Sequence, residues 1–275
     1  MNKDFAILIL THGRPDNVIT VDSLRLAGYT GEVHFVVDNE DKTLDKYIEN
    51  YGKAKVHVFD KKKYADESDE CNNFNERRTI THARNASFDI AKKIGKKYFM
   101  QLDDDYTSFL YRNEEEGAAI KSFDKIIESF IKFFDSVPCL SIAFSQGGDH
   151  IGGFQSLKLK RKCMNSFLCS TERPFKFVGA MNEDVNTYTT LGSRGHLFFT
   201  YMGLQLNQKA TQSQAGGITD MYLRYGTYCK AFTTVINMPS SVHVSLMGRK
   251  NKRLHHHITW KNTVPVIISE QYKKR

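Results

Sequence analysis

The residues best suited to chemistry are three consecutive carboxylates, Asp103–Asp105, which follow the apolar stretch Tyr98–Leu102. In an extended chain, side chains two residues apart point to the same side, so Asp103 and Asp105 can offer oxygen atoms to one cation. Such oxygens suit hard cations, Mg²⁺ or Mn²⁺, which also bind phosphate oxygens. The plain alternative is a solvated acidic turn that caps the next helix. The position directly after a predicted strand favours the metal site.

Other polar residues occupy similar positions. Thr11 and Arg14 follow the first apolar run of the chain, and Asp38 follows the second. In sheets whose strands are mainly parallel, ligands bind at the carboxyl ends of the strands. We therefore expect Thr11, Arg14, Asp38 and Asp103–Asp105 to converge on one ligand site.

The elements that must position these residues alternate between strand and helix over the first 135 residues. The predicted strands are Phe5–Leu10, Glu32–Val37, Val56–Phe59 and Tyr98–Leu102. The predicted helices run from Pro15 to about Ala27, from the acidic residues after Asp38 to about Tyr51, over Thr81–Ile94, and along the apolar stripe from Ile120 to Phe134. Residues 61–78 read as a polar loop. This alternation predicts an α/β fold with a mainly parallel sheet.

The second half of the chain is less regular and richer in Gly, Phe, Tyr and Thr. Its strand-like pieces are Leu140–Phe144, Leu157–Leu159, Leu197–Tyr201 and Thr233–Met238. Because neither a linker nor an internal repeat separates the halves, we expect one domain over residues 1–275, with a ligand-binding half over 1–135 and an elaborated half over 136–275.

Composition narrows the class of protein. The chain has 275 residues, 40% of them hydrophobic, and no apolar run reaches the length of a membrane span. The first strand begins too early for a cleaved signal peptide, and the five irregularly spaced cysteines are typical of reduced thiols in a cytoplasm. The net charge of +8 and the pI of about 9.1 favour a polyanionic partner.

The block that leads into the aspartates carries a family resemblance. Arg84 and Asn85 stand near the start of a predicted helix, and one strand then ends at Asp103. This order resembles nucleotide-sugar glycosyltransferases of the GT-A fold, especially the family 2 group. The resemblance implies a Rossmann-like GT-A fold, a metal ion on Asp103 and Asp105, and a nucleotide sugar beside Arg84 and Asp104. The plain alternative for Arg84 is a structural ion pair.

Two later positions take roles from the same resemblance. Glu183 and Asp184 match the acidic pair that supplies the catalytic base of inverting GT-A enzymes, with Asp184 preferred and Glu183 next. Such a base accepts the proton of an acceptor hydroxyl as that hydroxyl attacks the anomeric carbon. His243 matches a C-terminal histidine that completes the metal shell in several GT-A families. Taken alone, the acidic pair reads as a helix N-terminus and His243 as an ordinary strand residue.

A narrower resemblance covers most of the chain, from Thr11 to about Tyr272. The matching strings are Lys162–Phe167, Arg173–Phe177, Asn182–Tyr188, Gly216–Tyr222 and Gly226–Tyr228. They resemble the TET-associated glycosyltransferases, a group found largely in bacteriophages and similar to the base J glucosyltransferase.

This second resemblance implies a reaction. A UDP-sugar would bind with its nucleotide against Thr11, Arg14 and Asp38. The acceptor would be a 5-hydroxymethylpyrimidine in DNA, most of all 5-hydroxymethylcytosine, and the product would shield phage DNA from nucleases in the host cytoplasm.

Two basic segments of the second half fit a DNA acceptor. They lie at residues 158–162 and 249–253, and the expected DNA contacts are Lys160, Arg161, Lys162, Arg249, Lys252 and Arg253. A solvated charged face is the plain alternative, and His255–His257 also read as solvated.

Three rival functions stay open. A GT-A glycosyltransferase that acts on a polysaccharide or a protein would share every N-terminal motif. A sugar nucleotidyltransferase fits less well, because the loop after the first strand is the short Thr11–Pro15 rather than a long Gly-rich one. An inactive DNA-binding module would not need intact Asp103, Asp105 and Asp184. The sugar, the choice of cytosine or uracil, the form of the DNA and the oligomeric state are open at this point.

Overall fold

The computed structural model describes residues 2–67, 77–113, 117–150, 161–209, 222–224, 226, 228–248, 252–265 and 270. The elements of the first half are β1 (Phe5–Leu10), α1 (Thr20–Leu26), β2 (Val33–Asp38), α2 (Leu44–Tyr51), β3 (Val56–Phe59), α3 (Lys61–Ala65), α4 (Thr81–Lys93), β4 (Tyr98–Asp103), β5 (Tyr106–Arg112), β6 (Gly117–Ala119) and α5 (Phe123–Ser136). Those of the second half are β7 (Cys139–Ser145), η1 (Gly147–His150), β8 (Phe167–Ser170), α6 (Glu183–Ser193), β9 (Leu197–Gln208), α8 (Tyr228–Asn237), β10 (Val242–Met247), β11 (Arg253–Ile258) and η3 (Trp260–Asn262).

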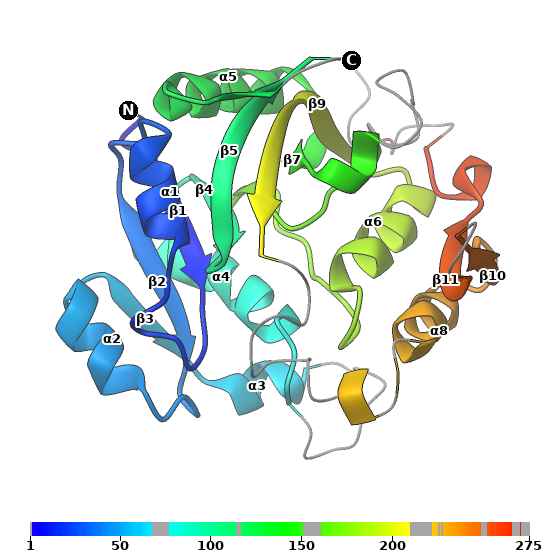
Figure 1. Ribbon diagram of the computed structural model, residues 1–275, viewed down its shortest axis with the longest axis horizontal. Coiled ribbons are helices and arrows are strands. Elements are labelled where there is room, and N and C mark those ends of the chain that lie inside the picture. The colour runs from blue at the N-terminus through cyan, green and yellow to red at the C-terminus, as the bar shows by residue number, and fades with distance from the viewer. Residues whose placement is uncertain are drawn as a thin grey trace.

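Nine of these strands form one sheet in the order β3-β2-β1-β4-β8-β7-β9-β5-β6 (Figure 1). The strands β3, β2, β1 and β4 are parallel to one another. In register, Leu10 of β1 lies beside Val36 of β2 and Asp103 of β4. The carboxyl ends of these strands therefore meet at one edge of the sheet, as the sequence predicted.

The rest of the sheet is mixed. From β4 onward the neighbours are antiparallel, except for the parallel pair β7 and β9. The predicted α/β fold is confirmed. The expectation of a mainly parallel sheet, however, holds only for the four N-terminal strands, because the described sheet has as many antiparallel as parallel pairings.

Helices cover both faces of the sheet, and alternating strand residues supply a core to each. On one side Ile7 and Ile9 of β1 pack in the same cluster as residues of α1, α2 and α5. On the other side Leu8 and Leu10 pack with residues of α4 and α6. Every residue of β1 is buried, which is typical of a parallel strand covered on both faces.

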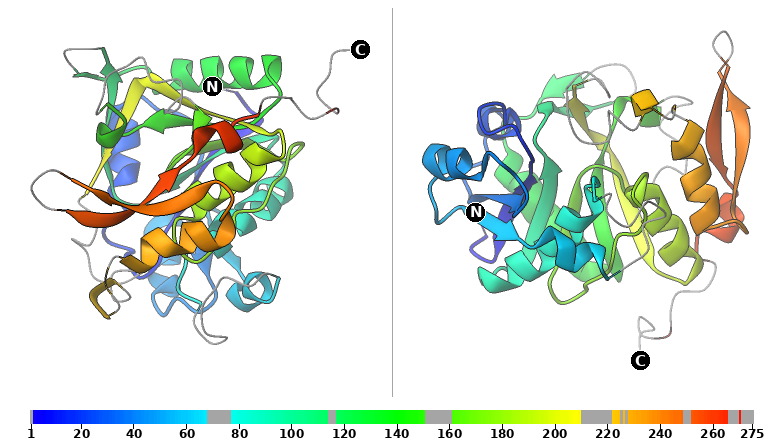
Figure 2. Two further views of the ribbon diagram at one scale, coloured as in Figure 1. Left: turned by 90° about the vertical axis from the view of Figure 1, so that its right-hand side faces the viewer. Right: turned by 90° about the horizontal axis from the view of Figure 1, so that it is seen from below.

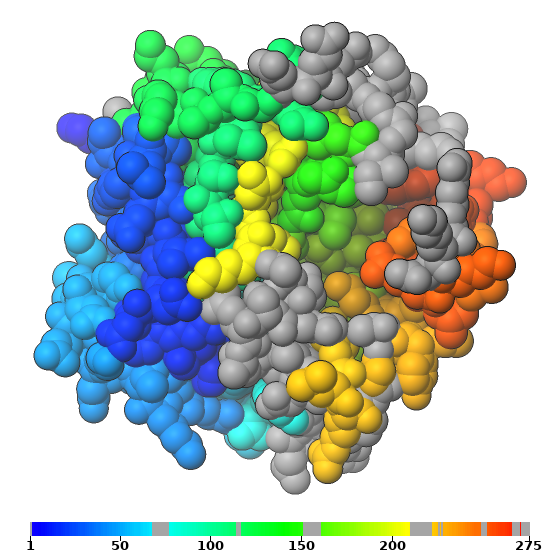
Figure 3. All heavy atoms as spheres, viewed as in Figure 1, coloured from blue at the N-terminus to red at the C-terminus, as the bar shows by residue number. Residues whose placement is uncertain are grey.

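The last elements form a layer outside α6. The strands β10 and β11 make an antiparallel hairpin, and α8 packs against both strands and against α6 (Figure 2). Trp260 after the hairpin stacks on Tyr188 of α6, with ring centroids 5.9 Å apart. In the space-filling view, residues 1–60 and this outer layer lie on opposite sides of the molecule (Figure 3).

Several sequence expectations for individual elements were wrong. The first helix begins at Thr20 rather than Pro15, because Arg14 N–H bonds the Tyr47 hydroxyl and the Pro15 carbonyl accepts from Tyr51, which holds an irregular segment there. The predicted strand Thr233–Met238 belongs almost entirely to α8. Its β-branched residues favour a strand locally, but helical spacing buries Ala231 and Thr234 against the body of the protein.

Other elements were missed or lie elsewhere. The strands β5, β6, β8 and β11 were not predicted, and His255–His257 lie in β11, where His257 is exposed. The predicted loop over residues 61–78 contains the short helix α3. The expected strand Leu157–Leu159 lies outside the described residues. Among the described helices, none has the length and apolar character needed to cross a membrane.

Candidate active site

One corner of the site joins the ends of β1 and β4. The Thr11 hydroxyl donates to Asp104 Oδ2 at 2.7 Å, and Arg14 Nη1 donates to Asp104 Oδ1 at 3.0 Å. Asp104 is 4% exposed, and burial raises its pKa although Arg14 opposes this shift. The structure therefore brings Thr11, Arg14 and Asp104 together as predicted. Both Asp104 oxygens are engaged within the protein, where they hold Thr11 and Arg14.

A second corner forms around Asp38 at the end of β2. His12 Nδ1 donates to Asp38 Oδ2 at 2.6 Å, and the Lys61 ammonium lies 3.5 Å from Asp38 Oδ1. Burial opposes ionisation of Asp38, but the His12 hydrogen bond and the Lys61 charge outweigh it and lower the pKa. The same hydrogen bond raises the pKa of His12. A ligand that contacts Asp38 directly must displace one of these two partners.

Three further residues at this edge, His12, Lys61 and His82, were not predicted from the sequence. The signal for the first two was present, because His12 follows β1 and Lys61 follows β3, at the same edge of the sheet. His82, in the first turn of α4, is 1% exposed, and its Nδ1 has no partner among the described residues. Burial and the nearby Lys61 charge lower the pKa of His82 to about 4.

The aspartates proposed for the metal, Asp103 and Asp105, are both partly exposed, whereas Asp104 between them is buried. Burial raises the pKa of Asp103 to about 7 despite the Arg84 charge, and the carboxylates of Asp105 and Glu183 add to the shift. Burial and the neighbouring Asp104 also raise the pKa of Asp105. Asp103 and Asp105 are thus two neighbouring, partly exposed carboxylates that repel each other. A divalent cation bound between them would relieve this repulsion.

His243 does not join these aspartates. It is exposed on β10, where its ring lies 4.8 Å from that of His257 on β11. Within the described ranges, no three His, Cys, Asp or Glu side chains are grouped closely enough to hold a metal ion. His243 as a third ligand is therefore not supported, because its strand belongs to the hairpin outside α6.

A buried arginine connects the aspartates to the acidic pair. Arg84 Nε donates to Glu183 Oε1 at 2.8 Å, and Arg84 Nη2 donates to Asp103 Oδ1 at 3.2 Å. The residue is 1% exposed, and its guanidinium lies 4.8 Å from the centroid of the Phe167 ring. Burial disfavours the charge, but the two carboxylates outweigh it and raise the pKa of Arg84. The predicted ligand contact at Arg84 is therefore replaced, for two of its nitrogens, by an internal bridge.

The acidic pair opens α6. Glu183 is fixed by Arg84, whereas Asp184 Oδ1 accepts only the N–H of Val185, at 2.7 Å, among the described groups. Burial and the Glu183 charge raise the pKa of Asp184 to about 6, and the Lys230 charge opposes the shift. The two carboxylates thus differ in their hydrogen bonds. Glu183 is held by a side chain, whereas Asp184 keeps an oxygen that can accept a proton.

Asn182, just before the pair, ties α6 to the outer layer. Its backbone is left-handed at φ 54°, and its Nδ2 donates to the Lys230 carbonyl at 2.7 Å and to Thr234 Oγ1 at 3.0 Å. The same atom lies 3.4 Å from His256 Nδ1 on β11. One side chain therefore sets the start of α6 against both α8 and the hairpin.

The residues expected to contact DNA are dispersed. Lys252 and Arg253 are exposed at the start of β11, and Arg161 is partly exposed. Lys162 instead forms an ion pair with Asp149, and its side chain is only 12% exposed, so it is a structural residue rather than a phosphate contact. Lys160 and Arg249 lie outside the described residues.

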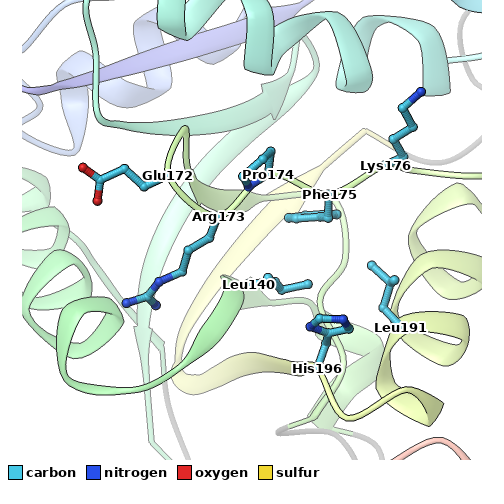
Figure 4. Close-up of a pocket in the computed structure, with 8 residues that line it drawn as sticks. All are labelled: Leu140, Glu172, Arg173, Pro174, Phe175, Lys176, Leu191 and His196. Atoms are coloured by element: carbon cyan, nitrogen blue, oxygen red, sulfur yellow. The ribbon is translucent and has the colours of Figure 1, made fainter. Parts of the chain in front are cut away.

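A pocket of about 470 Å³ lies elsewhere, between the start of β7, the end of α6 and the start of β9 (Figure 4). Its lining includes Phe175, Leu140 and His196, while Lys176 points away from them. Arg173 beside it donates to the carbonyls of Phe134, Val137 and Cys139. This pocket contains none of the predicted site residues, and a fixed guanidinium at its wall indicates a structural role.

Comparison with protein families places these features in context. Residues 5–217 match the model of the TET-Associated Glycosyltransferase family. The chain belongs to this family. A protein of the TET-associated family is a glycosyltransferase, and the match includes Thr11, the three aspartates and the acidic pair of α6. The comparison with curated proteins gives no match.

Solved structures give looser likenesses. Glucosyl-3-phosphoglycerate synthase from Mycobacterium tuberculosis, in complex with Mg²⁺ and UDP, has a TM-score of 0.48 at 10% identity over 92% of this chain and 87% of that one. Mannosyltransferase PcManGT from Pyrobaculum calidifontis, in complex with GDP-Man and Mn²⁺, has a TM-score of 0.48 at 10% identity over 86% and 74%. TarS 1–349 from S. aureus, in complex with UDP-GlcNAc, has a TM-score of 0.44 at 12% identity over 84% and 66%. The family membership rests on the match over residues 5–217.

Proposed function

We propose that this protein transfers a sugar from a UDP-sugar to the hydroxymethyl group of a 5-hydroxymethylpyrimidine in DNA, most of all 5-hydroxymethylcytosine. The observation that carries the proposal is the buried bridge Asp103–Arg84–Glu183, in a chain of the TET-associated family. One guanidinium holds Asp103, a carboxylate suited to the donor's metal, and Glu183, the neighbour of the carboxylate suited to the acceptor. Donor and acceptor chemistry therefore meet around a single fixed group.

On the donor side, Asp103 and Asp105 would hold Mg²⁺ or Mn²⁺, and Arg14 and the Asp38 corner would orient the nucleotide. A bound divalent cation would supply charge neutralisation for the departing diphosphate. Arg14 adds a fixed positive charge at the same edge, because Asp104 and Thr11 determine its orientation.

On the acceptor side, Asp184 is the base and Glu183 the positioning residue. Glu183 is engaged by Arg84, whereas Asp184 keeps a free oxygen and a pKa of about 6. The acceptor oxygen attacks the anomeric carbon, the bond from that carbon to the diphosphate oxygen breaks, and Asp184 takes the hydroxyl proton. A single displacement of this kind inverts the anomeric configuration.

The C-terminal region supports a polyanionic acceptor. Between Asp220 and Glu270 the sequence has no Asp or Glu, while it has seven Lys or Arg residues and four histidines. Lys252 and Arg253 are exposed there, on the layer that Asn182 joins to the acidic pair. Phosphate contacts supply most sequence-independent affinity for DNA, so this layer suits the DNA that flanks the target base.

Donor turnover tests the proposal. The protein is incubated with Mn²⁺, a panel of UDP-sugars, and DNA that contains 5-hydroxymethylcytosine, 5-hydroxymethyluracil or only unmodified bases. The DNA is digested to nucleosides and their masses are measured. Added sugar mass on the hydroxymethylated base alone is the expected result. Metal-dependent hydrolysis of a UDP-sugar without transfer would retain the glycosyltransferase but point to a polysaccharide or protein acceptor, and neither activity would leave an inactive DNA-binding module.

A further inference from the structure

An aromatic side chain beside the acidic pair has no part in the reaction described so far. Tyr222 lies in a single helical turn, Tyr222–Arg224, and its carbonyl accepts the N–H of Gly226 at 2.9 Å. The Lys230 ammonium lies 6.0 Å from the centroid of the Tyr222 ring. This contact places the ring next to the first turn of α8.

Lys230 also locates Tyr222 relative to the catalytic carboxylates. The Lys230 carbonyl is bound by Asn182, the residue that precedes Glu183 and Asp184, and the Lys230 charge acts on Asp184. Burial, together with the Glu183 and Asp184 charges, raises the pKa of Tyr222. Tyr222 and Lys230 are both only partly buried, and the main chain of Lys230 is bound to the residue that precedes the acidic pair.

We propose that Tyr222 and Lys230 form the subsite for the acceptor base, with the Tyr222 ring stacked on a pyrimidine turned out of the DNA. The inference rests on the proposed function, since it gives residues to the acceptor that the reaction requires. Inside a duplex the hydroxymethyl group is attached to a stacked base, and enzymes that modify such bases take them out of the stack into a pocket with an aromatic wall. Lys230 is the donor available to the pyrimidine O2, an acceptor that cytosine and uracil share. The subsite therefore holds either hydroxymethylated pyrimidine.

The chain offers a matched control. Tyr228 is six positions further along, is 53% exposed, and packs edge-on against Phe232 with ring centroids 6.4 Å apart. Within the described residues, Tyr228 has no ring contact with Lys230 and no electrostatic effect on Asp184. Removing its ring takes away a similar aromatic area without touching the proposed subsite.

The test compares Tyr222→Ala, Tyr222→Leu, Tyr222→Phe and Tyr228→Ala on duplex DNA with 5-hydroxymethylcytosine. Stacking on one base is worth about 1–3 kcal/mol, so Tyr222→Ala should lower kcat/KM for DNA by about 5- to 150-fold. Tyr222→Leu should fall nearly as far because it keeps bulk but no ring face, whereas Tyr222→Phe and Tyr228→Ala should stay near wild type. Metal-dependent hydrolysis of the UDP-sugar and the midpoint of thermal unfolding should not change in any variant.

The outcomes separate this inference from the function on which it rests. If the wild type glycosylates DNA and Tyr222→Ala and Tyr222→Leu do so equally well, the subsite is wrong and the function stands. An equal loss of donor hydrolysis and transfer in the Tyr222 variants, with Tyr222→Phe also affected, would make Tyr222 a structural residue and overturn the subsite. A wild type that hydrolyses donor but never modifies DNA would overturn the acceptor, and the subsite with it.

Discussion

The proposed donor and acceptor regions hold their carboxylates in different ways. We call the strand ends that carry Asp38 and Asp103–Asp105 the donor edge, and the start of α6 with Glu183 and Asp184 the acceptor edge. At the donor edge, Asp38 and Asp104 each have a cationic partner from a loop that follows β1. At the acceptor edge, the Asp184 carboxylate accepts only a backbone N–H of its own helix among the described residues. The donor edge is therefore organised before any ligand binds, and the acceptor edge retains a reactive carboxylate.

The difference follows from how each edge is built. The register of β1 with β2 and β4 brings the donor residues together with no contribution from the second half of the chain. The acceptor edge needs three elements, α6, α8 and β11, which meet at the side chain of Asn182. A substitution at the donor edge should therefore affect only its own contacts. A substitution at the acceptor edge should also shift α6, α8 and β11 relative to one another.

The largest expected effect is at the free carboxylate. Asp184→Asn should lower kcat for transfer by about 10²- to 10⁴-fold, because a general base contributes that much. Binding of the UDP-sugar should be unchanged, since the donor edge does not include Asp184. Single-turnover transfer and equilibrium binding of UDP measure the two quantities. If Asp184→Asn transfers sugar at the wild-type rate, Asp184 is not the base. Glu183 would then be the candidate, and the contrast between the two edges would no longer hold.

The metal carboxylates come next. Asp105→Asn should lower turnover by about 10²- to 10³-fold, because the cation supplies several kcal/mol of transition-state stabilisation. Asp105 is the cleaner choice, since Asp103 also receives a hydrogen bond from Arg84. Titration with Mn²⁺ in the presence of UDP should show the lost affinity. Asp149→Asn is the control for a lost carboxylate, because Asp149 is paired with Lys162 instead.

Arg84 joins the two edges, so its removal should affect the whole fold. Arg84→Met leaves Asp103 and Glu183 without their buried partner, and breaking such a pair costs about 3–5 kcal/mol of unfolding free energy. Arg14→Met should cost less, because the Arg14 side chain is 25% exposed and water can take its place. Urea unfolding of both variants gives the comparison. Equal losses would mean that Arg84 does not connect the edges.

The sequence predicted the donor edge better than the acceptor edge, for a physical reason. The ends of parallel strands coincide by register, so Thr11, Arg14 and Asp104 could be grouped from strand positions alone. The bridge from Arg84 to Glu183 spans 99 residues and depends on how α4 packs beside α6, which no local pattern encodes. His243 was assigned to the metal because its position in the hairpin could not be foreseen.

At saturating Mn²⁺ and UDP-sugar, the rate should depend on pH through the acceptor edge, because a bound divalent cation would keep Asp103 ionised although burial raises its pKa to about 7. Asp184 must be ionised to act as a base, and its pKa is about 6, so kcat should rise about tenfold between pH 5 and pH 7. At the donor edge, the His12 contribution to stability is lost only as pH rises through its folded pKa, which is above 6.5. The Asp38 contribution is lost only as pH falls through its folded pKa, which is below 3.8. Between pH 5 and pH 6.5, KM for the UDP-sugar should therefore change only through Asp103, and this change should vanish at saturating Mn²⁺. A change in kcat that vanishes with it would contradict the assignment of Asp184 as the base.

The smallest effect should come from the exposed cations of the outer layer. Lys252→Gln and Arg253→Gln should each reduce the slope of log K against log salt for duplex DNA by about 1, while kcat at saturating DNA is kept. Lys162→Gln should leave that slope unchanged, because its ammonium is occupied by Asp149. Fluorescence anisotropy at several salt concentrations measures the slopes. If Lys162→Gln lowers the slope and the other two do not, the DNA lies along η1 rather than along β11.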